Sequence, residues 1–384
     1  MERYSKRGYW VRQQSSLTVL KLTGFLLSNE FKLVISSWPT TSVQLMGINS
    51  IMEKQGGQHR FLREIIATSL GPAGLEILVP KICDSVQLYL DKNWNVRDEI
   101  SLFHSAKALT FTIVLECLLG LNFEPGTLCT FERVLEGVFA APVSFPGSKL
   151  SRAKKARREI KEMLIKVVRE KRKEMESGLV GDERMLFTRF VSGMIRGEIS
   201  EEEVIDNVVL LVFAAHDTTS FAIAMTFKMS KRRPGENLTL EDTKKMKYTW
   251  QVARESMRLF PPIFGSFRKA IADIEYEGFT IPKGWKILWT TYGTHYNEEH
   301  FKDPLTFNPR RFEEPIPPYA YLPFGGGPRI CAGNQLAKLN ILIFIHYVVT
   351  RYNWSLLCPD EQITTDPLPF PSHGMPIKVS LKSS

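Results

Sequence analysis

The stretch PFGGGPRICAG, residues 323–333, decides how this chain is interpreted. Three consecutive glycines permit positive φ angles and a close approach of the backbone to a flat partner. The proline after them restricts the next turn. Cys331 then stands just before a helix predicted from near Gly333 to about Arg351. The free N–H groups and dipole at a helix N-terminus stabilise an anion, so this position favours a thiolate.

Two kinds of function need such a thiolate, nucleophilic catalysis and metal binding. A cysteine nucleophile needs a histidine base and an orienting group, and no motif around the seven histidines supplies them. A haem iron needs one thiolate on an open loop of small residues, which the glycines provide. A glycine-rich turn with a buried cysteine is the alternative, because free cysteines are commonly buried. The loop by itself leaves these alternatives open.

The composition is that of a globular protein. Of 384 residues, 43% are hydrophobic and 11% aromatic, which is enough for a large core in one domain spanning 1–384. The five cysteines are scattered and contain no CxxC pair, so neither a disulfide framework nor a zinc site is expected, and a reducing compartment is indicated. They are Cys83, Cys117, Cys129, Cys331 and Cys358.

Charge and hydropathy select no partner by themselves. The net charge of +9 suits an anionic membrane, an acidic protein or nucleic acid. Because no continuous run of 18 apolar residues occurs, we expect no transmembrane helix. The basic segment 149–173 carries apolar residues at helical spacing, which predicts an amphipathic helix with a solvated basic face. No aromatic residues interleave its charges, which argues against nucleic acid as a partner.

The hydrophobic periodicity predicts a mainly helical, α+β fold. A β-rich N-terminal part is expected over about residues 1–45, with strands at 16–22 and 32–36. Helices are expected through the bulk of the chain, about 58–260, and strands again over 264–293.

Two further motifs contain paired charges. In ESMR, residues 255–258, Glu255 and Arg258 are three positions apart on a predicted helix and can pair. In FNPRRF, residues 307–312, Arg311 could reach a buried Glu255. A carboxylate between two guanidiniums would tie this irregular region to the helix, whereas an isolated surface pair would contribute little.

AAHDTT, residues 214–219, follows a buried apolar run in a predicted long helix. The Thr218 hydroxyl is expected to bond back to the carbonyl of Ala214 and bend the helix, and the alanines leave a groove. An acid and an alcohol beside a groove can relay protons to a bound molecule, so Asp217 and Thr218 are candidate catalytic residues. A solvent-exposed helical turn is the alternative. His216 is expected to be a neighbour rather than a ligand.

AAHDTT, ESMR, FNPRRF and PFGGGPRICAG occur in this order, and together they resemble the motifs of a cytochrome P-450. The cysteine loop matches the family at Phe324, Gly325, Gly327, Arg329, Cys331 and Gly333. The details GSFRKA, IPKGW and FAAHDTTS look most like the plant clan that oxidises triterpenoids, sterols and related terpenoids. The resemblance implies the P-450 fold, mainly α with a small β subdomain, incomplete relative to the family.

The resemblance implies a role for each matching position. Cys331 would be the thiolate ligand of the iron of haem b. Asp217 and Thr218 would deliver protons to dioxygen in a groove lined by Ala214 and Ala215. The structural triad would be Glu255, Arg258 and Arg311. The haem would further be held by Arg329, Arg268, His59, Arg63, Phe324 and Gly325. Residues 264–267 would line the substrate pocket.

The reaction implied is the insertion of one oxygen atom of O2 into a hydrophobic substrate that is a terpenoid, a triterpenoid or sterol-like. Electrons would come from NADPH through a separate flavoprotein reductase. We expect a monomer with no nucleic-acid partner, on the cytosolic face of the endoplasmic reticulum membrane. Since the chain starts after the family's membrane helix, a peripheral or cytosolic location is the alternative.

One departure from the family favours a different class of function. After Met229 the family continues the long helix and adds another, whereas here Ser230 leads directly into KRRPGENLTLED. A spliced or truncated, non-catalytic remnant with impaired haem binding is therefore the alternative. The Asp217–Thr218 pair argues against isomerase or dehydratase chemistry, because such chemistry needs no proton relay to oxygen.

Overall fold

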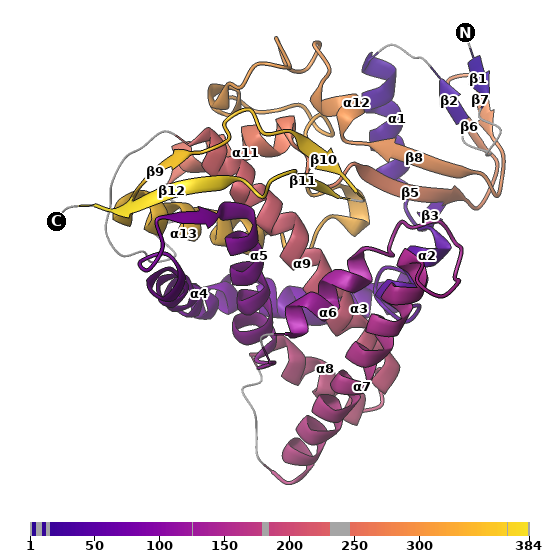
Figure 1. Cartoon of the computed structure of the whole chain (residues 1–384). Helices are drawn as coiled ribbons and strands as arrows, with labels where there is room; N and C mark the ends of the chain where they lie inside the picture. Colours follow the sequence, from indigo (N-terminus) through magenta and orange to yellow (C-terminus); the bar gives the residue numbers. More distant parts are fainter. Residues whose placement is uncertain are drawn as a thin grey trace.

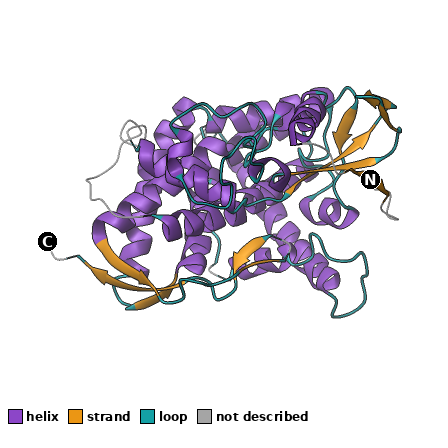
Figure 2. Ribbon diagram, turned by 90° about the horizontal axis from the view of Figure 1, so that it is seen from above, coloured by secondary structure: helices purple, strands orange, loops and turns teal. Residues whose placement is uncertain are grey.

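Helices form most of the molecule, and two small sheets lie at opposite sides of the helical bulk (Figures 1 and 2). The structure is a computed structural model. It describes residues 2–4, 10–12, 16–124, 126–178, 184–230, 246–366 and 368–382.

The helices follow in chain order. They are α1 (Ser16–Ser28), α2 (Thr40–Met46), α3 (Gly56–Leu70), α4 (Pro72–Asn93), α5 (Leu102–Thr112) with its π-helical continuation η1 (Ile113–Leu119), α6 (Thr127–Leu135), α7 (Lys149–Glu176), α8 (Leu186–Ile195), α9 (Glu201–Met229), α11 (Lys247–Leu259), α12 (Tyr292–His295) and α13 (Asn334–Arg351). Short 3₁₀ turns occur at η2 (Pro309–Phe312) and η3 (Gly327–Arg329).

All strand pairs are antiparallel apart from one isolated bridge. One sheet has the order β3 (Val34–Ser36), β5 (Gly265–Ala270), β8 (Lys286–Thr290), and the other has the order β4 (Glu99–Ser101), β12 (Pro376–Leu381), β9 (Tyr352–Leu356). Three pairs stand apart: β1 (Glu2–Tyr4) with β2 (Trp10–Arg12), β6 (Ile274–Tyr276) with β7 (Phe279–Ile281), and β10 (Ile363–Thr365) with β11 (Pro369–Pro371).

The central element is α9, which packs against α5, α7, α11 and α13. Its first turn is closed by a capping box, in which the Ser200 hydroxyl and the Glu203 carboxylate satisfy each other's backbone N–H groups. Most of its residues from Val204 to Phe227 are buried, so it forms the axis of the core.

The prediction of a strand at residues 16–22 is wrong, because these residues lie in α1. Leu26 and Leu27 are buried on this helix, and a helical turn places both against partners that are distant in sequence. Leu26 packs in the cluster beneath β3 and β5, and Leu27 packs against Trp289 and Leu322. Tertiary packing therefore overrides the local β propensity. The N-terminal part also contains α2, and β3 lies within the predicted strand 32–36.

Two helical stretches have the length and apolar composition of a membrane span, contrary to the sequence-based expectation. They are Leu102–Leu119 and Glu201–Met229, and the bent pair α3 and α4 would be a third if it formed one span. In each of the two stretches, 72% of the apolar window is buried inside the fold, so these residues are core residues here.

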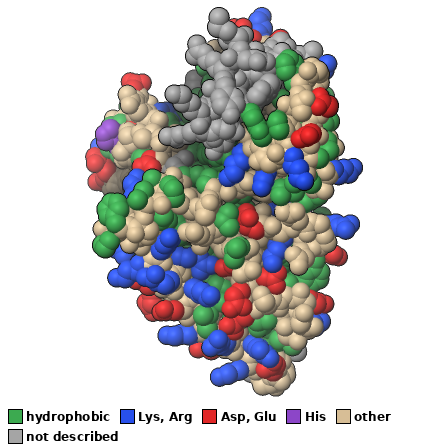
Figure 3. Space-filling model, turned by 90° about the vertical axis from the view of Figure 1, so that its right-hand side faces the viewer, with side chains coloured by type: hydrophobic (Ala, Val, Ile, Leu, Met, Phe, Trp, Pro, Cys, Tyr) green, Lys and Arg blue, Asp and Glu red, His purple; other side chains and the backbone are tan. Residues whose placement is uncertain are grey.

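The basic segment 149–173 lies in α7, which spans Lys149–Glu176. Its buried face contains Ile160, Leu164 and Val168, at the spacing of one helix face. On the face of the molecule drawn in Figure 3, Lys and Arg side chains are interspersed with Asp and Glu side chains over the lower part. The segment 231–245, where the sequence departs from the family pattern after Met229, lies outside the described residues.

Candidate functional site

A largely apolar cavity of about 390 Å³ lies between α9 and the loop that precedes α13. The loop contributes Cys331, and α9 contributes Ala214, Ala215 and Thr218. Most of the remaining wall comes from α3, β5, β8, α11 and α13, and from the segments that precede α3 and β5.

The glycines of the cysteine loop have two different uses. Gly325 and Gly326 line the cavity, and Gly325 has a φ of 69°, which glycine adopts without strain. Gly327 also has a positive φ, of 67°, but a Cβ atom there would lie 2.1 Å from the carbonyl oxygen of Leu27. The third glycine therefore allows α1 to approach the loop, which the sequence did not indicate.

The Cys331 thiol is accessible from the cavity although it lies deep in the molecule. Burial raises its pKa, while a hydrogen bond from Gly333 and the positive charge of Arg63 oppose this. The N–H at the helix N-terminus favours the thiolate, as expected from sequence, but burial of the sulfur has the larger effect on its pKa. A cation bound at the sulfur would reverse the balance, because a metal ion is the largest local charge in such a site.

Four basic side chains line the same cavity: His59 and Arg63 from α3, Arg268 from β5, and Arg329 from the cysteine loop. Burial, together with the charges of Arg329 and Arg63, lowers the pKa of His59 to about 4, so this imidazole is neutral at pH 7. The Arg63 guanidinium has no hydrogen-bond partner among the described side chains and backbone groups, and its N–H donors are available to an anion in the cavity.

Arg329 is held by the protein itself. Its guanidinium bonds Glu30 at 2.6 Å, the carbonyls of Ile51 and Met52 at 3.2 Å each, and that of Lys54 at 2.6 Å. Most of its donors are therefore engaged, and it fastens the cysteine loop to the chain before α3. Of the arginines predicted to bind haem carboxylates, this one has the least donor capacity left.

The structure brings Thr218 to the cavity but not Asp217. The Thr218 hydroxyl donates to the carbonyl of Ala214 at 2.6 Å, as the sequence predicted. Asp217 is buried on another face of α9, with its Oδ1 3.1 Å from the ammonium group of Lys107. Consecutive residues of a helix are rotated by about 100° about its axis, and this rotation directs Asp217 to Lys107 while Thr218 lines the cavity. The expectation that both side chains face the groove is corrected in this respect.

Glu255 lies between two guanidiniums and is fully buried. Arg258 donates to its two oxygens at 2.8 and 2.9 Å, and Arg311 donates at 3.2 Å. Arg258 also donates to the carbonyl of His295, and the Asn308 N–H donates to Glu255. The network therefore ties α11 to the irregular region before the cysteine loop.

Comparison with known proteins settles the family. The sequence profile of the cytochrome P450 family matches residues 29–235 and 228–380. This chain belongs to the cytochrome P450 family.

The relatives of this P450 are enzymes. Taxane 13-alpha-hydroxylase of Taxus cuspidata is 35% identical over 93% of this chain and 80% of its own length. Beta-amyrin 28-monooxygenase of Kalopanax septemlobus is 33% identical over 92% of this chain and 79% of its own length. Among solved structures, the retinoic acid-bound cyanobacterial CYP120A1 superposes with a TM-score of 0.86 and 27% identity, over 94% of this chain and 88% of that one. The chain is a P450 monooxygenase with the P450 fold.

The residues around the P450 cavity fit a haem. Its iron would meet the accessible thiol of Cys331, which lines the cavity. The haem carboxylates would meet the unpartnered guanidinium of Arg63 and the N–H groups of Arg268. The indole Nε1 of Trp289 is a buried donor without a partner on the same wall. The apolar remainder of the lining suits the porphyrin rings and a hydrophobic substrate.

The expected substrate-lining segment 264–267 contributes only in part. Gly265 and Ser266 line the cavity, whereas Phe264 and Phe267 do not. The two phenylalanines lie in an aromatic cluster. The ring centroid of Phe264 is 5.8 Å from that of Phe139, and the ring centroid of Phe267 is 5.8 Å from that of Trp38.

Glu30, Thr219 and Trp289 are among the residues of this site that sequence reasoning missed. Glu30, which contacts Arg268 and Arg329, lies in no recognised motif. Thr219 lines the cavity beside Thr218, and the doubled threonine in AAHDTT was the only signal for it.

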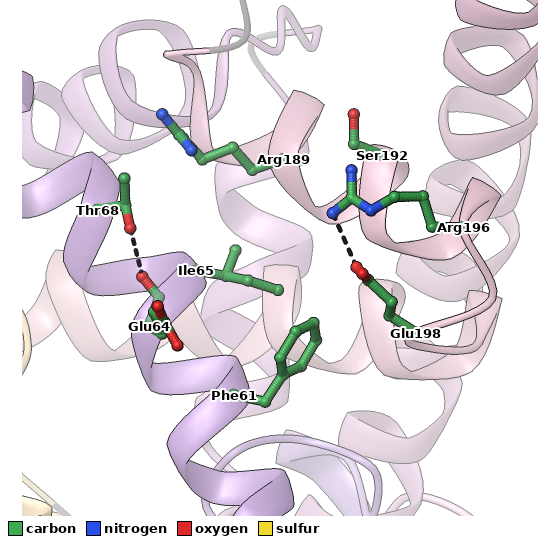
Figure 4. Close-up of a pocket in the computed structure, with 8 residues that line it drawn as sticks. All are labelled: Phe61, Glu64, Ile65, Thr68, Arg189, Ser192, Arg196 and Glu198. Carbon is green, nitrogen blue, oxygen red and sulfur yellow. Dashed lines mark hydrogen bonds and ion pairs between the residues drawn. The ribbon is translucent and has the colours of Figure 1, made fainter.

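A second pocket, of about 280 Å³, lies between α3 and α8 (Figure 4). Phe61, Glu64 and Ile65 line it from α3, and across it Arg196 bonds Glu198 at 2.7 Å. It shares no lining residue with the cavity at Cys331, and none of the predicted site residues lies in it.

Proposed function

We propose that this P450 binds haem b through Cys331 and inserts one oxygen atom of O2 into a terpenoid, triterpenoid or sterol-like substrate. The observation that carries the proposal is the accessible Cys331 thiol in an apolar cavity that Thr218 also lines. When bound, the haem would supply oxygen activation, with electrons that come from NADPH through a separate reductase. The site of action is the cytosolic face of the endoplasmic reticulum membrane.

The chain's own residues would bind the haem and fix its position in the cavity. Cys331 holds the iron, and its backbone N–H donates to the carbonyl of Phe324 at 2.9 Å, which fixes the loop. Arg63, Arg268 and the neutral His59, which line the cavity, would hold the haem carboxylates. The apolar side chains of the cavity exclude water from the remaining space.

Thr218 lines the cavity, where its hydroxyl can take part in proton delivery. Its hydroxyl proton is directed at the Ala214 carbonyl, so its oxygen is left to accept a hydrogen bond from a water in the cavity. That water would be held beside the substrate as a proton donor. Asp217, paired with Lys107, lies behind Thr218 and reaches the cavity only if this pair opens.

The substrate class is supported by the apolar lining and by the relatives. The names of those relatives state oxidation of taxanes and of beta-amyrin, which are terpenoids. A titration of the haem-loaded protein with beta-amyrin, a taxane and a straight-chain fatty acid tests this assignment. A spin-state change in the Soret band with a terpenoid supports it, and a response to the fatty acid alone contradicts it.

The test of the haem site is a carbon monoxide difference spectrum of the reduced protein. A thiolate-ligated haem gives a red-shifted Soret band, and Cys331→Ser should abolish it. Cys358→Ser is the matched control, because Cys358 is exposed and does not line the cavity. Absence of haem uptake by the unchanged chain, or a band typical of a neutral thiol or histidine, would sink the proposal in favour of the non-catalytic alternative.

A further inference from the structure

Glu30 stands between two of the cavity's guanidiniums. Its side chain is 1% exposed, and its carboxylate oxygens lie 2.6 Å from Nε of Arg268 and 2.6 Å from Nε of Arg329. The N–H of Ser36 donates to the same carboxylate at 3.0 Å. One carboxylate therefore joins the end of α1, strand β5 and the cysteine loop.

The charges of the cavity explain why a carboxylate is needed there. Arg63, Arg268 and Arg329 line the cavity, and no Asp or Glu lines it among the described residues. Two buried guanidiniums next to each other repel: burial lowers the pKa of Arg268, Arg329 lowers it further, and Glu30 opposes both effects. Glu53 also lies within electrostatic reach of Arg329, but no hydrogen bond joins these two among the described contacts.

The geometry shows which donors Glu30 leaves available. The Glu30 carboxylate lies at Nε of both arginines. Nη1 of Arg268 donates to Ser266 Oγ and to the Phe267 carbonyl, at 2.9 Å each. Nη2 of Arg268 has no hydrogen-bond partner within the described part of the chain. The ion pair with Glu30, which lacks hydrogen-bond geometry, and the two bonds of Nη1 hold the guanidinium of Arg268 with Nη2 free at the cavity wall.

We propose that Glu30 is a positioning residue for the haem carboxylates, which orients Arg268 and Arg329 and lowers the reduction potential of the bound haem by offsetting their positive charge. This inference rests on the proposed haem binding. A negative charge beside the haem favours the more positive, oxidised iron, and the buried location keeps the effect from being screened by solvent.

The experiment is a charge cycle on the haem-loaded protein. The midpoint potentials of the unchanged chain, Glu30→Gln, Arg268→Gln and the double variant are measured by anaerobic titration with dithionite, followed in the Soret band. Glu30→Gln should shift the one-electron equilibrium at least threefold towards the reduced form, and Arg268→Gln should shift it towards the oxidised form. The double variant, which removes one charge of each sign, should lie close to the unchanged chain.

Glu361→Gln is the matched control. Its carboxylate is also buried, with the side chain 2% exposed, but it accepts from the backbone of Met375 and does not line the cavity. Its potential should equal that of the unchanged chain. A shift as large as that of Glu30→Gln would overturn the inference, because burial alone would then explain both.

Loss of one partner of a buried ion pair destabilises a protein, so Glu30→Gln alone could fail to fold. The comparison of Arg268→Gln with the double variant then isolates the charge of Glu30, and the double variant should have the higher potential. Equal potentials in each available comparison overturn the inference while leaving the proposed function intact. An unchanged chain that takes up no haem overturns both.

Discussion

Thr218 and Asp217 are adjacent in α9, yet their side chains have different surroundings. Thr218 lines the cavity, and Asp217 is paired with Lys107, which also bonds Glu132 at 2.9 Å. Asp217 and the ammonium group contribute to packing α9 against α5, and the hydroxyl is available to the cavity. We therefore expect the two residues to give different phenotypes when substituted.

Thr218→Ala should leave the fold and haem uptake unchanged but uncouple NADPH consumption from product formation, since a water in the cavity loses its partner. Asp217→Asn should instead lower the free energy of unfolding by about 3 kcal/mol, because it breaks a buried ion pair. Product formed per NADPH consumed and urea unfolding separate the two effects. Equal coupling in Thr218→Ala and the unchanged protein would refute the role of the hydroxyl.

At the scale of elements, α9 holds the segment 47–54 that precedes α3. Asp206 accepts from the backbone of Asn49 at 3.0 Å and pairs with Arg157 of α7, and Asn207 accepts from the N–H of Ile51 at 2.9 Å. Ile51 and Met52 line the cavity, and their carbonyls accept from Arg329. The segment is therefore fastened to α9 on one side and to the cysteine loop on the other.

Asp206→Asn should lower the free energy of unfolding by about 3–5 kcal/mol, because Arg157 loses its buried partner. Amide hydrogen exchange in residues 47–52 should become faster, since the carboxylate no longer holds their backbone. The control is Glu201→Gln on the same helix, and it should cost far less stability than Asp206→Asn, because the side chain of its partner Arg169 is 62% exposed. The same loss of stability in both variants would contradict the fastening role.

For the whole molecule, four histidines are buried among the described residues, His59, His216, His295 and His346, and the pKa is shifted in the first three. Burial lowers the pKa of these three, to about 4 for His59 and about 3 for His295. Nε2 of His295 accepts the N–H of Leu322 at 2.8 Å, so protonation there would break a hydrogen bond. The folded state therefore binds fewer protons at these residues than the unfolded chain, whose histidines titrate near pH 6.5.

Stability should rise with pH wherever the unfolded state binds more protons. The neutral histidines should thus make their full contribution to the free energy of unfolding above about pH 6.5. This contribution should fall as the pH drops from there towards 4. Urea unfolding at pH 7 and pH 5 checks this, and His295→Gln should show a weaker dependence on pH than the unchanged chain. Equal stability at both values would show that the buried histidines are not neutral in the fold.

The spacing of residues within short segments was sufficient to predict several features of this P450. Glu255 and Arg258 are three residues apart on one helix, so their pairing follows from helix geometry. The bond from Thr218 to Ala214 and the capping box at Ser200 follow from the same short-range rules. The cysteine loop and the three motifs before it are short local patterns, so together they indicated the family before any contact was known.

Tertiary structure decided what depends on distant partners. Residues 16–22 belong to a helix whose buried Leu26 packs with Val34 and Ala270 and whose buried Leu27 packs with Trp289 and Leu322. Glu30 meets Arg329 across 299 positions of sequence, and Asp217 turns to Lys107 on another helix. Burial, rather than the nearby helix terminus, sets the direction of the Cys331 pKa. Periodicity and short motifs determine local geometry, whereas desolvation and ion pairing depend on which segments the fold brings together, and no local pattern encodes that.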